Sequence, residues 1–85
     1  MNNTFGNVLQ DLLNEKRIPQ AVLAEETGIT RASISRYVNG KRFPSSESII
    51  KIANFFDIDE NLLYAALEKD SRKIRYSIST YYKNK

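Results

Sequence analysis

Residues 29 to 46 carry four Lys or Arg side chains and no Asp or Glu. Among five residues of this segment, four carry hydrogen-bond donors and one carries only a methyl group; the residues are Arg31, Ala32, Ser33, Ser35 and Arg36. An arginine can bond O6 and N7 of guanine together, and an alanine methyl can contact the methyl group of thymine. Lys41 and Arg42 follow in the sequence and can attract phosphate. The chemistry that these residues support is contact with duplex DNA.

The spacing around these residues predicts the elements that must position them. Residues 20–44 hold a small residue, a turn glycine and apolar positions spaced to pack two helices across a tight turn, which is a helix-turn-helix pattern. Gly28 can adopt the left-handed conformation that ends a helix, and Thr30 offers a side-chain oxygen to cap the next one. We therefore expect one helix over 19–27, with its proline in the first turn, and another over 31–38.

Apolar periodicity predicts three more helices and an all-α fold. The first runs from about residue 5 to residue 15 with Asn3 or Thr4 as cap, another runs from Ser45 or Ser46 to Phe56, and a fifth follows the cap Asp59. We expect Asn39 and Gly40 to close the helix over 31–38, because both tolerate positive φ. The residues expected on the buried faces include Val22, Leu23, Ala24, Ile34, Ile49, Ile50, Ile52, Ala53, Phe56, Leu62, Leu63, Ala66 and Leu67.

Composition limits the possible functions. A chain of 85 residues is expected to form one domain, and it contains no cysteine and no histidine. It therefore lacks the commonest zinc ligands and the usual general base and thiol nucleophile, so we expect no enzyme, no metal, no cofactor and no small-molecule ligand. No apolar run approaches the roughly 20 residues that span a bilayer, and the start of the chain does not resemble a signal peptide. We expect a cytoplasmic protein without membrane association.

The last part of the chain differs in charge from the rest. Residues 67 to 85 hold six Lys or Arg against two Asp or Glu, so we divide the chain into a helix-turn-helix domain over 1–67 and a basic C-terminal extension over 68–85. The extension fits a helical stripe and also alternates as a strand would; we favour the helix slightly. The stripe either forms a homodimer interface or folds back on the core, and the basic side chains could instead lie along DNA. The candidate interface residues are Ile74, Ile78, Tyr81 and Tyr82.

As a set, the motifs of residues 5–67 resemble the Cro/CI-type helix-turn-helix family of phage and bacterial repressors, also called the XRE family. Two positions depart from the family pattern: Pro19 stands where Ser or Thr commonly caps the second helix, and Asp57 stands where the family commonly has Gly. The residues that carry the resemblance are Gln20, Leu23, Ala24, Gly28, Ile29, Ile34, Asn39, Gly40, Lys41, Arg42, Pro44, the Ile-Ile-Lys-Ile-Ala run over 49–53 and the segment over 57–63.

The resemblance implies a five-helix, lambda-repressor-like fold in which the helix over 31–38 reads bases in the major groove. For Tyr37 we expect the ring to pack and the hydroxyl to stay free to reach phosphate. Solvated surface charge remains the alternative for the basic residues. The candidate base contacts are Arg31, Ala32, Ser33, Ser35 and Arg36. The candidate phosphate contacts are Gln20, Thr30, Tyr37, Asn39, Lys41 and Arg42.

The function implied is that of a sequence-specific transcriptional regulator, a repressor of a phage or mobile element. One recognition helix reads only a few base pairs, so we expect a homodimer on double-stranded DNA, with half-sites about 34 Å apart. The alternative is a protein-interaction module of the same fold, antitoxin-like or an adaptor, that docks a regulatory protein partner and binds DNA only secondarily.

Overall fold

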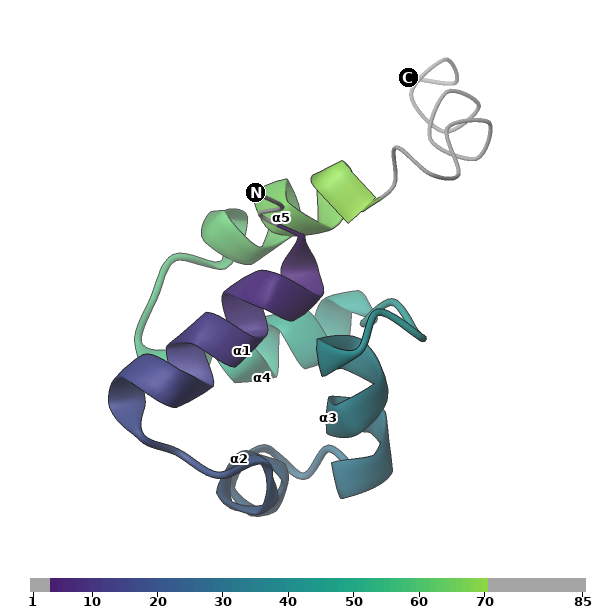
Figure 1. Ribbon diagram of the computed structural model, residues 1–85. Helices are drawn as coiled ribbons and strands as arrows, with labels where there is room; N and C mark the ends of the chain where they lie inside the picture. Colours follow the sequence, from purple (N-terminus) through teal and green to yellow (C-terminus); the bar gives the residue numbers. More distant parts are fainter. Residues whose placement is uncertain (1–3, 71–85) are drawn as a thin grey trace.

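The computed structural model describes residues 4–70, which form five helices and no strand (Figure 1). The all-α, five-helix expectation is confirmed for this part of the chain. α2 and α3 pack against each other, α1 contacts both α3 and α5, and α4 contacts α2 and α5. The helices are α1 (Phe5–Lys16), α2 (Gln20–Thr27), α3 (Arg31–Val38), α4 (Ser46–Phe56) and α5 (Glu60–Asp70).

Side-chain caps set the first residue of four helices. In each case a Thr, Ser or Asp oxygen accepts a backbone N–H that the helix itself leaves unpaired. Thr4, rather than Asn3, caps α1, and Ser45, rather than Ser46, caps α4. The capping bonds run from Asn7 N to Thr4 Oγ1 (3.5 Å), from Ser33 N to Thr30 Oγ1 (3.1 Å), from Ser48 N to Ser45 Oγ (3.1 Å) and from Asn61 N to Asp59 Oδ1 (2.9 Å).

α2 begins without a side-chain cap. Pro19 has extended backbone angles (φ −67°, ψ 152°) and occupies the capping position, so the helix starts at Gln20, one residue later than the sequence predicts. The Pro19 carbonyl accepts the backbone N–H of Val22 and of Leu23. Proline provides the fixed φ that a helix start needs, but it has no side-chain oxygen to offer.

Three helices end in the same hydrogen-bond arrangement, in which a left-handed residue turns the chain back over the last turn. The left-handed residues are Arg17 after α1 and Asp57 after α4, both with φ 57°, and Gly40 after α3, with φ 71°. Asn39 and Gly40 close α3 as expected; of the two, Gly40 has the positive φ, whereas Asn39 has φ −88°. The position where the family commonly has glycine thus requires a left-handed backbone, which Asp57 adopts at a steric cost.

The buried core is formed by all five helices, around Phe5, Leu9, Leu23, Ile34 and other apolar residues. Three positions expected on buried faces are solvent-exposed instead: Val22 (39% exposed), Ile50 (40%) and Leu62 (49%). Ala24 is half-buried and packs against the core. Each of the exposed residues directly precedes or follows a buried one, so the apolar stripe of each helix is narrower than the run of apolar residues in the sequence.

Candidate nucleic-acid interface

α3 buries one face and leaves the opposite face to solvent. Ile34 is fully buried and Tyr37 is 4% exposed, which fixes the rotation of the helix about its axis. On the outer side Arg31, Ala32 and Arg36 are exposed. Ser33 and Ser35 border this surface and are half-buried. All five candidate base contacts therefore lie on, or at the edge of, the solvent-facing side of one helix.

The C-terminal end of α3 lies directly against the first turn of α1. A Cβ atom built on Gly6 would lie 2.7 Å from the carbonyl oxygen of Val38 and 2.9 Å from that of Tyr37. The Phe5 and Tyr37 rings meet edge to face, with centroids 6.1 Å apart. α1 thus supports the helix that carries the candidate base contacts, and only a residue without a side chain fits at Gly6.

Tyr37 differs from its sequence prediction in one respect. Its ring packs in the core as expected, but its hydroxyl oxygen lies 3.2 Å from Ser48 Oγ, at the start of α4. The hydroxyl is therefore bonded within the fold, and its assignment as a phosphate contact stays a prediction. Tyr37 links α3 to α1 and α4. An aromatic residue inside a helix gives no signal in the sequence for such a bond, because the partner is eleven residues away.

The loop after α3 carries basic side chains into solvent. Lys41 N donates to Arg36 O at 2.8 Å, which turns the chain back along the helix, and the side chains of Lys41 and Arg42 are exposed. The Asn39 side-chain amide is directed at the helix end, where it donates to Ser35 O at 2.9 Å. Pro44 is buried and anchors the far end of the loop.

A chain of side-chain hydrogen bonds joins this loop to the start of α3. Arg42 Nη1 donates to Ser33 Oγ at 3.3 Å, and Thr30 Oγ1 donates to the same oxygen at 2.9 Å. Sequence patterns identify Thr30 as the cap but give no indication that Arg42 folds back by nine residues onto Ser33. The path of the loop determines that contact.

Gln20 lies at the other end of the motif, as the first residue of α2, and its side chain is half-buried. Because Pro19 supplies no side-chain acceptor, no side chain caps this helix end. Such a start can offer backbone N–H groups and the positive end of the helix dipole to an anion.

Charge is segregated over the described helices. The four basic residues of α3 and its following loop have no acidic residue within 29–46, whereas Lys51 on α4 forms a 3.2 Å ion pair with Glu47. The four basic side chains are all exposed: Arg31, Arg36, Lys41 and Arg42.

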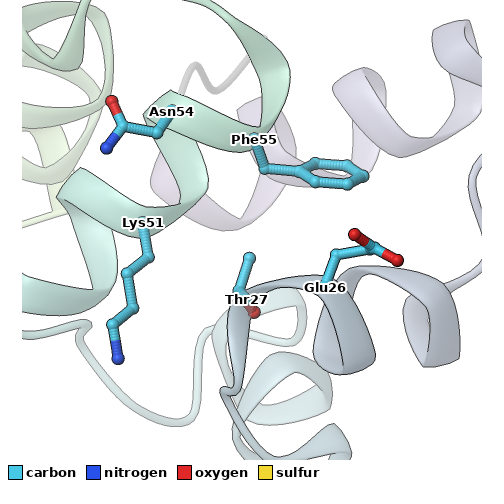
Figure 2. Close-up of a pocket in the computed structure, with 5 residues that line it drawn as sticks. All are labelled: Glu26, Thr27, Lys51, Asn54 and Phe55. Carbon is cyan, nitrogen blue, oxygen red and sulfur yellow. The ribbon is translucent and has the colours of Figure 1, made fainter.

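An open hollow lies between α2 and α4, lined by Glu26, Thr27, Lys51, Asn54 and Phe55 (Figure 2). Figure 2 shows the Phe55 ring extending above Glu26, while the Lys51 side chain extends in another direction. The Thr27 hydroxyl donates to Leu23 O at 2.7 Å, and Lys51 is paired with Glu47. No residue of α3 lines this hollow, so it is separate from the basic surface.

The remaining sequence predictions concern the C-terminal extension, metal binding and membrane-spanning helices. The proposed interface residues Ile74, Ile78, Tyr81 and Tyr82 lie outside residues 4–70, and their role stays a prediction. Within the described range, no group of three or more acidic side chains is placed to hold a metal ion. None of the five helices there is both long and apolar enough to cross a membrane.

Comparison with known proteins places the motif among regulators. The sequence model of a helix-turn-helix family matches residues 9–63, more than half of the chain. The protein is 37% identical over 54 residues to the HTH-type transcriptional activator BcrR of Enterococcus faecalis, a match that covers 64% of this chain and 26% of BcrR. It is 31% identical over 59 residues to the ImmF control region 10 kDa protein of Bacillus phage phi105, covering 69% of this chain and 66% of that protein.

A third relative is the uncharacterized HTH-type transcriptional regulator YqaE of Bacillus subtilis (strain 168), which is 30% identical over 59 residues. That match covers 69% of this chain and 51% of YqaE. The aligned part spans less than two thirds of the length of each of these three relatives. No solved structure matches the chain significantly.

Proposed function

The chain belongs to the Cro/CI-type (XRE) helix-turn-helix family of transcriptional regulators, and from this we propose that it is a sequence-specific repressor of a phage or mobile element. In this proposal α3 enters the major groove of double-stranded DNA and the protein occludes a promoter. The similarity to a phage control-region protein supports the phage setting. Steric occlusion requires only that the domain occupy its site.

The observation that carries this proposal is the exposed, acid-free surface formed by α3 and the loop after it. Its four basic side chains supply the electrostatic attraction that duplex DNA requires. The α3 side chains between them supply donors for base edges and a methyl group for thymine. If this surface only faced solvent, nothing would require residues 29–46 to lack acidic side chains.

The contacts fall into two groups in the proposed complex. Gln20 binds phosphate through its amide and the first turn of α2, and the remaining phosphate contacts come from the turn and the loop around α3. Tyr37 positions α3, and contact of its hydroxyl with phosphate stays a prediction. The base contacts are Arg31, Ala32, Ser33, Ser35 and Arg36. The phosphate contacts are Gln20, Thr30, Asn39, Lys41 and Arg42.

The proposal includes a homodimer in the cytoplasm, with no enzymatic activity and no cofactor. Two copies bind half-sites about 34 Å apart, since one helix contacts few base pairs. Residues 74, 78, 81 and 82 are the proposed dimer contacts. Sedimentation tests this part: a variant with Ile74→Asp and Ile78→Asp should become monomeric, and an unchanged dimer would place the interface elsewhere.

A fluorescence titration against duplexes that tile the DNA around the gene tests the function as a whole. A scrambled duplex at the same near-physiological salt is the control. Binding to one tile at least about a thousandfold more tightly than to the scramble is the expected result. Equally weak binding to every tile, with Kd near 10⁻⁴ to 10⁻⁶ M, would contradict a nearby operator. It would favour the protein-interaction module instead, to be followed by a search for its partner.

A further inference from the structure

The hydrogen bonds around Ser33 leave its hydroxyl able to act towards a ligand only as a donor. Its oxygen accepts from Thr30 Oγ1 at 2.9 Å and from Arg42 Nη1 at 3.3 Å. Thr30 Oγ1 itself accepts from Ser33 N at 3.1 Å, which fixes the position of the threonine side chain. A serine oxygen has two acceptor sites and one hydrogen to donate. Both acceptor sites of Ser33 are occupied, so the group it can still offer is its hydrogen.

Arg42 is drawn back over α3 by the same contact. The loop places Lys41 N 2.8 Å from Arg36 O, and the Arg42 side chain continues along the helix until it reaches Ser33. A guanidinium has five N–H donors, of which the Ser33 bond uses one. The other donors of this exposed side chain therefore lie beside the outward face of α3 rather than at the tip of the loop.

We propose that Ser33 and Arg42 form one reading unit that presents only hydrogen-bond donors to the major groove and selects guanine. This inference rests on the proposed function, and it moves Arg42 from the phosphate contacts to the specificity-determining residues. Guanine presents two acceptors, O6 and N7, on its major-groove edge. Adenine places an amino donor beside its single acceptor N7, and cytosine presents an amino donor there. Thymine presents one acceptor, O4, beside its methyl group, so a surface with several donors and no acceptor matches guanine best.

The competing role for Arg42 is a phosphate clamp that leaves Ser33 when DNA binds. The two roles differ in what can be measured. A clamp neutralises phosphate charge, so its loss weakens all duplexes equally and lowers the salt dependence of binding. A reading unit affects the preferred duplex alone, and its two members depend on each other.

The experiment begins by selecting the preferred duplex from a randomised duplex pool with the full-length wild-type protein. Affinities for that duplex and for a scrambled duplex are then measured for Ser33→Ala, Arg42→Ala and the double variant. Each single change should lower the affinity for the preferred duplex by about five- to 150-fold. The affinity of the double variant should be only slightly lower than that of the weaker of the two single variants. Scrambled binding should stay within about twofold.

Conservative variants separate charge from geometry. Arg42→Lys keeps the charge but lacks the planar fork of donors, so it should behave like Arg42→Ala on the preferred duplex. Ser33→Thr keeps the hydroxyl and should retain most of the affinity. Lys41→Ala, in the same loop and with the same charge, is the matched control and should weaken both duplexes equally. Thermal melts of all variants verify that they are folded.

The outcomes are distinct. A wild-type protein that selects no common sequence would overturn the proposed function and the reading unit with it. If the protein selects a sequence but the fold-losses in affinity of the two single variants multiply in the double variant, the reading unit alone is overturned. The same holds if Arg42→Ala weakens binding to both duplexes equally. Coupled losses that disappear when one guanine of the preferred duplex is replaced by adenine would establish it.

Discussion

Replacing Gly6 with alanine should destabilise the protein through the contact between α1 and α3. The added Cβ would lie 2.7 Å and 2.9 Å from two backbone carbonyl oxygens, whereas carbon and oxygen atoms normally approach to about 3.3–3.6 Å. Because both obstacles are backbone atoms, neither can rotate away. One helix must move by about 0.6 Å relative to the other to restore a normal contact.

The size of the effect follows from two opposing contributions. Overpacking of this kind costs about 1–3 kcal/mol, and a backbone obstacle favours the upper end of that range. Alanine gains at most about 1 kcal/mol over glycine in a helix, which leaves a net loss of about 2 kcal/mol. For a domain of this size, that loss lowers the melting temperature by about 8–16 °C. The displacement also moves the end of α3, so DNA affinity should fall as well.

Thermal denaturation followed by circular dichroism measures this loss directly. Asp11→Ala, an exposed change on the same helix, is the control and should stay within about 0.5 kcal/mol of wild type. If Gly6→Ala melts at or above the wild-type temperature, α1 does not approach the end of α3 as closely as described, and the support we assign to it is wrong.

Four further changes test other contacts. Lys41→Ala should reduce the slope of log affinity against log salt by about 0.9, and an unchanged slope would mean that Lys41 touches no phosphate. Arg31→Ala should cost about 1–3 kcal/mol on the preferred duplex alone, whereas a uniform loss would assign Arg31 to phosphate. Tyr37→Phe removes the bond to Ser48 and should cost about 1 kcal/mol in urea unfolding; wild-type stability would show that this bond contributes nothing. Asp57→Gly removes the strain of a left-handed backbone, which costs about 1–2 kcal/mol, but glycine gives the unfolded chain extra freedom worth about 0.5–1 kcal/mol. The variant should therefore be more stable by about 0.5–1 kcal/mol. A lower melting temperature would contradict this.

Helix boundaries were predictable because they depend on residues next to one another. Thr30 and Asp59 cap the helices that follow them, and Gly28 is left-handed, all as local turn chemistry predicts. Positions at the edges of apolar stripes were not predictable from local sequence. Ile50 and Leu62 continue apolar runs but face solvent, since the neighbouring helices cover a narrower strip than each run offers.

In the candidate site too, features set by local sequence were predictable and features set by tertiary contacts were not. The outward direction of Arg31 and Arg36 follows from helical periodicity, because the buried Ile34 and Tyr37 fix the rotation of α3. The engagement of Tyr37 with Ser48 and of Arg42 with Ser33 depends on how segments nine to eleven residues apart meet in space. Residue types alone allowed a free tyrosine hydroxyl and an extended arginine equally well.

Because α3 is short, the proposed DNA-reading surface persists only as long as the whole fold does. Helices of eight residues do not persist alone in water, where about 12–15 residues are marginal. α3 therefore exists only while α1 and α2 hold it. Under the proposed function, a cellular protease that captures the unfolded chain would abolish DNA recognition at the same time. Conversely, an operator present at 100 times its Kd would add about 2.7 kcal/mol of protection, so bound copies should outlast free ones in the cell.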